Sequence, residues 1–135
     1  MKPMVCLGIL LALALAGAAR AAALDWQRFQ DANVIHIVTH DEDGALRETS
    51  VWIVTLDDHG YVRTNDSRWL ANIRRGSGVA LRLGEQEFAV SAREPNDAAL
   101  SARVEEQFKR KYGFMQRVMS VFRMREPTVL ELTAR

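Results

Sequence analysis

The sequence predicts an α+β domain built on a small, mainly antiparallel β-barrel. Three observations lead to this prediction. Short β-branched stretches bounded by Gly, Asn and Asp recur along the chain, as is typical of strands joined by tight turns. Stretches with the apolar spacing of helices interrupt them, and the longest follows Pro95. The chain has no internal repeat and no low-complexity linker. Strands interrupted by helices in one short chain favour a single α+β barrel.

Six strands are expected, joined by polar turns. The first two form a hairpin around Asp41-Glu42-Asp43-Gly44. The second strand ends at Asp57-Asp58-His59-Gly60, where the glycine is expected to supply a positive φ angle. The predicted strands cover residues 34–39, 47–56, 61–64, 79–83, 87–93 and 127–133.

Three helical stretches are expected between the strands. Residues 24–30 form a short amphipathic turn or helix, and residues 67–75 a short helix with Asp66 or Ser67 as its N-cap. The longest helix opens at Asn96, a plausible cap.

Spacing along this last helix predicts how it packs. Its apolar residues recur every four positions and form one stripe, made of Leu100, Val104, Phe108 and Tyr112. On another face, Glu105 and Glu106 precede Lys109 and Arg110 by four residues, which predicts two ion pairs. We expect Gly113 to break the helix and residues 114–125 to resume it.

Residues 1–21 have the features of a secretory leader. Met1-Lys2 supplies a positive start, residues 4–18 are an almost unbroken Leu/Ala run, and Ala19-Arg20-Ala21 offers a small-x-small cleavage pattern. The run is shorter than the about 20 residues that a membrane-spanning helix needs. We therefore expect a cleaved signal peptide over residues 1–21, one domain over residues 22–135, no stable membrane insertion after cleavage, and a periplasmic or secreted location in a bacterium. An uncleaved N-terminal anchor is the alternative.

Loss of the leader changes what the composition allows. Lys2 and Arg20 would leave with it, so 16 of the 18 basic residues remain against 17 acidic ones. A net charge near −1 argues against a nucleic-acid partner, because such binding usually needs a strongly basic face. Cys6, the single cysteine, would leave as well. The mature chain would then have no disulfide, thiolate nucleophile or cysteine-ligated metal.

The segment 61–83 contains the candidate binding site. A strand carrying Arg63 and Thr64 runs into a polar loop and then into a basic helix that begins near Ser67 and Arg68. Free N–H groups at a helix start and nearby guanidinium groups can hold a phosphate. We expect these four residues to bind an anion, with both arginines at the surface. The alternative is a solvated basic face that balances nearby aspartates, with Arg63, Arg68, Arg74 and Arg75 facing Asp57, Asp58 and Asp66.

Other polar motifs have simpler explanations. His36 and His40 share one face of a strand but lie about 13 Å apart, too far to bind one metal ion together. The turn at residues 41–44 lacks the downstream glutamate of a calcium loop. No metal site is expected. No acid–base or nucleophile constellation stands out, so the sequence assigns no catalytic residue.

Several short motifs resemble one known superfamily. They are Ser50-Val51-Trp52-Ile53-Val54, Tyr61-Val62-Arg63-Thr64, Ser67-Arg68 with Asn72-Ile73 and Val79-Ala80-Leu81, and Lys111-Tyr112-Gly113. With the element order, they resemble the split β-barrel flavin-binding superfamily, which includes pyridoxamine-phosphate-oxidase-like and deazaflavin-dependent proteins. Within it, the chain is similar to a small uncharacterised single-domain group. The resemblance implies a six-stranded antiparallel split β-barrel with interspersed helices, and a homodimer with a cofactor ring across its interface.

The resemblance also implies a cofactor. Ser67 and Arg68 match the start of a Ser-Arg-Lys run that grips the flavin phosphate in the oxidases, and Trp69 replaces the lysine. Arg63 is our own candidate for the missing charge. Flavin mononucleotide (FMN) is the first expectation, and deazaflavin and haem stay open. We expect an exported oxidoreductase that uses a flavin-like cofactor, or a cofactor-free binding module on the same fold.

Overall fold

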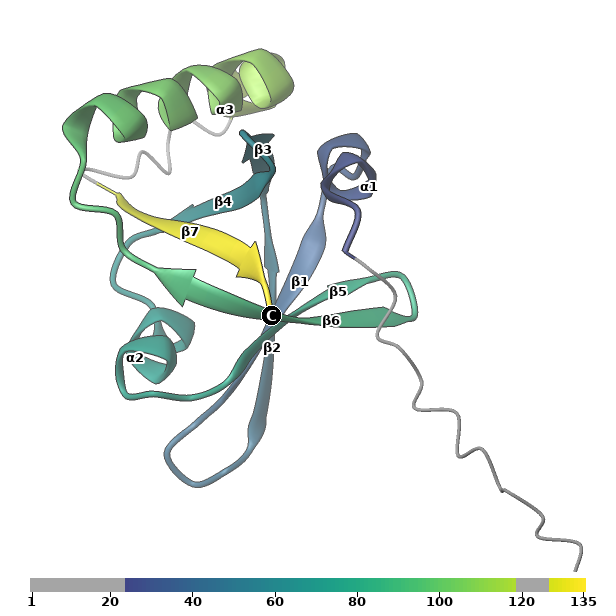
Figure 1. The fold of residues 1–135 in the computed structure, drawn as a ribbon, viewed down its shortest axis with the longest axis vertical. Helices are drawn as coiled ribbons and strands as arrows, with labels where there is room; N and C mark the ends of the chain where they lie inside the picture. The colour runs from purple at the N-terminus through teal and green to yellow at the C-terminus, as the bar shows by residue number, and fades with distance from the viewer. Residues whose placement is uncertain (1–23, 119–126) are drawn as a thin grey trace, which may run out of the picture.

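The computed structural model describes residues 24–118 and 127–135, which form an α+β fold around one curled antiparallel sheet (Figure 1). The sheet order is β2-β1-β5-β6-β7-β4-β3. The predicted fold class is confirmed, and the sheet has seven strands where six were expected. The strands are β1 (Ile35–His40), β2 (Leu46–Val51), β3 (Val54–Leu56), β4 (His59–Thr64), β5 (Val79–Leu83), β6 (Gln86–Arg93) and β7 (Thr128–Ala134).

The additional strand arises from a bend in one predicted strand. Residues 47–56 were expected to form a single strand, but it is interrupted at Trp52 and Ile53. Its first part, β2, pairs with β1, and its second part, β3, pairs with β4. Since β2 and β3 are the two ends of the sheet order, this bent segment joins the two edges of the curled sheet.

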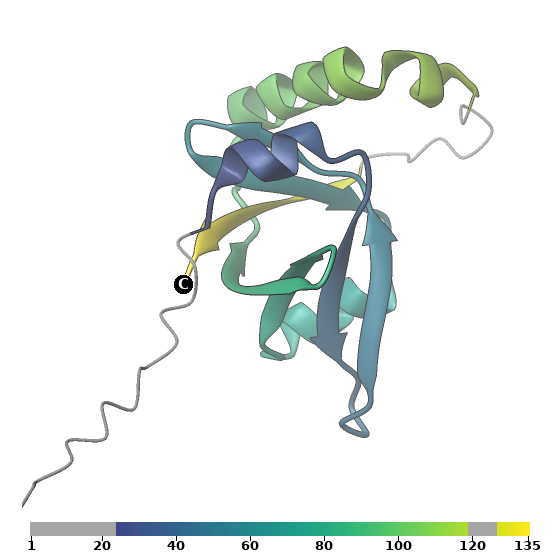
Figure 2. The same ribbon diagram turned by 90° about the vertical axis from the view of Figure 1, so that its right-hand side faces the viewer.

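Two short helices place side chains inside the curled sheet, and a long one covers its outside. From α1 (Trp26–Asp31) and α2 (Arg68–Arg74), Phe29, Trp69 and Leu70 enter the inner core. The helix α3 (Ala98–Val118) lies across β3, β4 and β7 (Figures 1 and 2). This outer cluster consists of Val54, Tyr61, Val104, Phe108, Tyr112 and Val129. All four residues of the predicted stripe pack here, since Leu100 lies against the same cluster.

The turn between β3 and β4 differs from its prediction. Asp57 and Asp58 have the positive φ angles, 51° and 60°, whereas Gly60 lies within β4. A pair of residues with positive φ is the geometry of a tight hairpin turn, which Asp tolerates. Gly60 serves close packing instead, because a Cβ atom there would overlap the Trp26 ring.

Helix α3 is more continuous than predicted. It runs through Gly113, so the expected break is wrong. A glycine inside a helix destabilises it by only about 1 kcal/mol relative to alanine, and the buried aromatic stripe before it outweighs this. Its cap is also one residue later than expected, since Asp97 Oδ1 accepts from the Leu100 N–H at 3.1 Å. Residues 119–125 of the predicted continuation lie outside the described residues.

Candidate functional site

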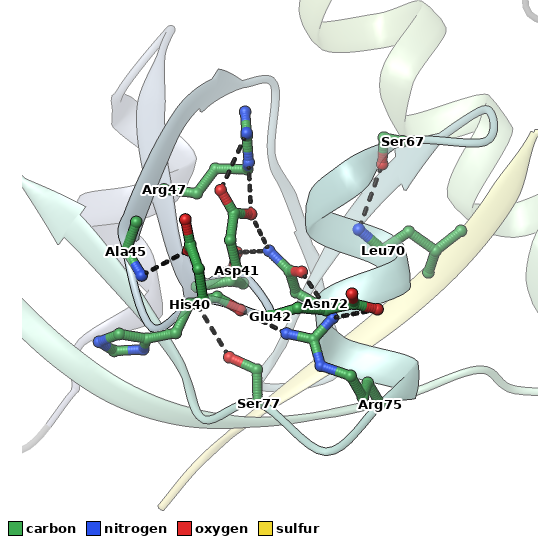
Figure 3. A network of polar contacts seen from close by, with 12 residues as sticks. His40, Asp41, Glu42, Ala45, Arg47, Ser67, Leu70, Asn72, Arg75 and Ser77 are labelled. Carbon is green, nitrogen blue, oxygen red and sulfur yellow. Dashed lines mark hydrogen bonds and ion pairs between the residues drawn. The ribbon is translucent and has the colours of Figure 1, made fainter.

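The four predicted site residues lie where β4 leads into α2. Arg63 and Thr64 end β4, Ser67 is the N-cap of α2, and Arg68 is its first residue. The N-cap prediction for Ser67 is confirmed, because its Oγ accepts from the Leu70 N–H at 3.3 Å (Figure 3). The Ser67 hydroxyl thus pairs with a backbone N–H group of its own helix that would otherwise have no intrahelical acceptor.

Arg63 is covered by α3 and its side chain is only 12% exposed, so the prediction that it lies at the surface is wrong. Its Nη1 donates to Glu105 Oε2 at 2.5 Å. Its guanidinium carbon lies 4.2 Å from the centre of the Phe108 ring, a stacking contact that adds to the ion pair. Arg63 therefore holds a carboxylate in a partly buried place between the sheet and a helix.

Glu105 is only half satisfied by this contact. Its Oε1 atom is buried and has no hydrogen-bond partner. The side chain as a whole is 34% exposed, so part of it reaches solvent. A buried carboxylate oxygen without a donor destabilises the arrangement that contains it.

The other two predicted residues face different surroundings. Thr64 is buried and lies opposite Thr128 in the β4–β7 pairing. Arg68 is exposed and makes no hydrogen bond or ion pair with any residue of 24–118 or 127–135. Its charge helps to lower the pKa of Asp41 in the β1–β2 hairpin. The structure therefore keeps the four residues in one stretch of chain, but Arg63 contacts α3 while Arg68 is left to solvent near the hairpin.

Next to Arg68 lies a polar network that the sequence analysis missed (Figure 3). Arg47 donates to both oxygens of Asp41, at 2.8 and 3.0 Å. Asn72, which is 3% exposed, donates to Asp41 Oδ1 at 2.8 Å and to Thr39 Oγ1 at 3.1 Å. The hydrogen bond from Arg47, followed by the one from Asn72, lowers the pKa of Asp41 to about 2.

The network continues through the basic residues of α2. Arg75 donates to Asn72 Oδ1 at 3.1 Å and to the His40 carbonyl at 2.8 Å, and Ser77 Oγ accepts from the His40 N–H. Arg74 pairs with Glu94. These arginines therefore have specific partners, none of which is an aspartate that the basic-face alternative considered. An asparagine inside the basic helix was the one available signal, since asparagine is a poor helix former.

A second arrangement that the sequence analysis missed holds the bend between β2 and β3. Lys111 Nζ donates to the carbonyls of Ile53, at 2.7 Å, and Phe29, at 3.0 Å. The Tyr112 hydroxyl accepts from the Ile53 N–H at 3.2 Å and lies 2.8 Å from the Asn33 carbonyl. Trp52 stacks on the Tyr112 ring with 4.4 Å between centroids. Burial lowers the pKa of Lys111 to about 8.

A third carboxylate is buried in the sheet beside α3. Glu131 Oε1 accepts from Arg93 Nε at 2.7 Å, and its Oε2 accepts from the Tyr61 hydroxyl at 3.0 Å. These bonds, the Arg93 one first, lower the pKa of Glu131, while burial raises the pKa of Tyr61 to about 12. Both oxygens of this carboxylate are satisfied, unlike those of Glu105.

A shallow hollow of about 570 Å³ lies elsewhere, between α1, the β3–β4 turn and α3. Three aspartates line it, and none of the predicted site residues does. Within the described ranges there is no group of three or more potential metal ligands. No helix among those residues is long and apolar enough to cross a membrane.

The matching family model covers almost all of this architecture. Residues 25–132 match a family described as uncharacterized proteins conserved in bacteria, DUF2255. The chain belongs to this family. No curated protein matches this DUF2255 chain.

Solved structures similar to the DUF2255 chain confirm the split-barrel fold that the motifs implied. The conserved hypothetical protein Rv2991 of Mycobacterium tuberculosis has a TM-score of 0.66 at 19% identity, over 81% of this chain and 77% of that one. The heme storage protein HutZ of Vibrio cholerae has a TM-score of 0.63 at 14% identity, over 81% and 86%. An F420-H2 dependent reductase, FDR-A, has a TM-score of 0.57 at 13% identity, over 75% and 94%.

Proposed function

We propose that this protein binds a flavin-like, phosphate-bearing cofactor through Arg63 and the start of α2, and that it acts as an oxidoreductase with that cofactor. The fold supports the cofactor class, since similar structures include a reductase named for F420-H2 and a protein named for heme. When bound, the cofactor would supply the redox chemistry, and the protein would hold and orient it.

The contact between Arg63 and Glu105 is the observation that carries this proposal. It places a guanidinium, backed by an aromatic ring, against an anionic oxygen in a partly buried setting. Guanidinium groups bind phosphate and carboxylate with the same geometry, so a phosphate oxygen can take the place of the carboxylate. Arg68, exposed a few residues further on, would supply a second charge.

The tryptophan that replaces the lysine of the oxidases' Ser-Arg-Lys run takes no part in the proposed phosphate site. Trp69 is 4% exposed and belongs to the inner core. It therefore packs the barrel, and the charge for a phosphate has to come from Arg63 and Arg68. The residues present fit a phosphate on the condition that Glu105 gives up its contact with Arg63.

Location and assembly belong to the same proposal. A leader over residues 1–21 would export the domain of residues 22–135, which would acquire its cofactor outside the cytoplasm. A homodimer would cover the cofactor ring from the second side. The resemblance supports the dimer, and the Leu/Ala run supports export.

A cofactor-free binding module is the second candidate, favoured by one observation. Three of the predicted site residues are engaged internally, since Arg63 bonds to Glu105, Ser67 caps α2 and Thr64 is buried. A barrel that has lost its cofactor is expected to satisfy these groups in this way.

An absorption spectrum of the protein, purified after expression of the full chain, followed by titration with FMN, separates the two candidates. We expect a flavin, deazaflavin or haem band, or saturable FMN binding that Arg68→Ala weakens about tenfold, the effect of one charge-assisted contact. Arg110→Ala, which removes another exposed arginine, from α3, is the control. A colourless protein that ignores FMN, deazaflavin and haem would refute cofactor binding and leave the module.

A further inference from the structure

We propose that Glu105 is a built-in competitor for the anion site, which exchanges Arg63 for Lys109 when a phosphate-bearing ligand binds. This inference rests on the proposed function and adds how the site is regulated. It assigns a role to a residue outside the segment that the motifs identified. It also explains why one position of the α3 surface carries a carboxylate that the fold leaves half satisfied.

The bonding of Glu105 differs from that of two other carboxylates that are buried or partly buried. Asp41 and Glu131 have donors at both oxygens, from side chains on four different elements in total. Glu105 has a donor at Oε2 only, and its Oε1 is buried without one. A contact that leaves a desolvated oxygen unpaired is less favourable than a complete one, so another anion can replace it more readily.

Lys109 offers the Glu105 carboxylate a second ion-pair partner. It lies four residues later on the same helix, a spacing at which Glu and Lys side chains meet. Lys109 is exposed and makes no hydrogen bond or ion pair with the part of the chain that the structure describes. Because the Glu105 side chain is already 34% exposed, side-chain rotation can carry its carboxylate outward without moving α3. The two arrangements therefore differ by rotamers only.

The chemistry of the exchange favours phosphate over weaker anions. A carboxylate tethered to α3 competes at a high effective concentration, so a free monoanion displaces it poorly. A phosphate monoester carries nearly two charges and three acceptor oxygens, which match the fork of the guanidinium better than one carboxylate oxygen does. Glu105 would thus exclude small monoanions and admit a phosphate-bearing ligand, at a cost in affinity.

The test compares FMN with riboflavin, which lacks the phosphate, on the full chain and its variants. Glu105→Gln keeps the size of the side chain and removes the competing charge. We expect it to tighten FMN binding about tenfold, within the usual range of coupling between sites, and to leave riboflavin binding unchanged. Glu106→Gln, at the adjacent exposed position paired with Arg110, is the matched control and should change neither.

A second variant keeps the test decisive if Glu105→Gln does not fold. Lys109→Met removes the alternative partner and should weaken FMN binding several-fold in the native background. It should leave riboflavin binding unchanged, because riboflavin has no phosphate that displaces the Glu105 carboxylate.

The outcomes separate the two proposals. If FMN binds the native protein and Glu105→Gln equally, or binds the variant more weakly, the competitor role is overturned while cofactor binding stands. If Lys109→Met binds FMN as tightly as the native protein, the exchange is overturned. If neither FMN nor inorganic phosphate binds to the native protein or to Glu105→Gln, the competitor role of Glu105 and the proposed function are both refuted.

Discussion

Two carboxylate–arginine contacts of this barrel differ in how completely they are bonded. At the β1–β2 hairpin, Asp41 accepts hydrogen bonds at both oxygens, from Arg47 and Asn72. Under α3, Glu105 accepts one from Arg63, and its second oxygen has no donor. A complete network makes one conformation much more stable than its alternatives, whereas an incomplete one leaves alternatives close in free energy. The first contact therefore supports the fold, and the second is suited to exchange.

The largest loss of stability is expected at Asn72, at the centre of the complete network around Asp41. Asn72→Ala removes the donor to Thr39 Oγ1 and one of the two donors to Asp41 Oδ1, at a nearly buried site. We expect a loss of about 2 kcal/mol in the free energy of unfolding, measured by urea denaturation. Asn96→Ala, at an exposed position, is the control and should change stability little. An equal effect of the two substitutions would show that the network contributes nothing.

A smaller loss is expected at the bend between β2 and β3. Tyr112→Phe keeps the ring that stacks on Trp52 but removes the hydroxyl that accepts from the Ile53 N–H. Because this buried N–H then has no acceptor, we expect about 1 kcal/mol less stability by urea denaturation. Unchanged stability would mean that the Tyr112 hydroxyl does not help to hold the bend.

Acid should weaken the complete network specifically. The pKa of Asp41 is about 2 in the folded protein against an ordinary value of 3.8, so its contribution is full above about pH 4 and is lost as pH falls toward 2. Unfolding free energies measured from pH 5 to pH 2 should therefore fall less steeply in Asp41→Asn than in the native protein. Parallel curves would contradict this assignment.

Raising the pH should increase the stability of the folded protein through Lys111. Burial lowers the pKa of Lys111 to about 8 from 10.5, so the unfolded chain binds more protons than the folded one between these values. Stability should then rise with pH across this window. A neutral amine still has two N–H donors for the Phe29 and Ile53 carbonyls, so no hydrogen bond is lost. Lys111→Met should abolish the rise, and a rise of the same size in the variant would refute its origin.

The smallest change in stability is expected at the incomplete contact between Arg63 and Glu105. Glu105→Gln should change the unfolding free energy by less than about 1 kcal/mol, since the Glu105 side chain is 34% exposed and its carboxylate has a donor at one oxygen only. The comparison with Asn72→Ala in the same urea experiment is the direct test. A loss as large as that of Asn72→Ala would make the Glu105 contact structural and remove the basis for exchange.

Much of the fold was predictable because it depends on local patterns. Strands lie in all six predicted segments, although the segment 47–56 is split into two, and Ser67 caps its helix as expected. The bend at Trp52 and Ile53 was not predictable, because the groups that hold it, Lys111 and Tyr112, lie more than fifty residues away in the chain. The turn at Asp57 and Asp58 was assigned to the wrong residue, because glycine is the usual source of a positive φ angle and here its role is to make room for Trp26.

The candidate site was predictable as a segment and not as a constellation. The strand, loop and basic helix that contain Arg63, Thr64, Ser67 and Arg68 are present in the expected order. Whether these residues bind an anion stays a prediction. The partner of Arg63 was not foreseen, since Glu105 was assigned to Lys109 on its own helix. Asn72 was seen only as part of a helix and of a motif that carries the resemblance, and Asp41 only as part of a turn.

Local sequence patterns were enough to place most strands and helices, to identify the apolar face of the long helix, and to show that one stretch of chain concentrates arginines near a helix start. These properties depend on neighbours a few residues apart, through periodicity, capping and turn chemistry. Which charged side chains pair with one another depends instead on tertiary packing. Arg63 and Glu105 are 42 residues apart in the chain and meet because α3 packs its aromatic stripe on the sheet beside Arg63. Hydrophobic packing sets that placement, and the ion pairs follow from it.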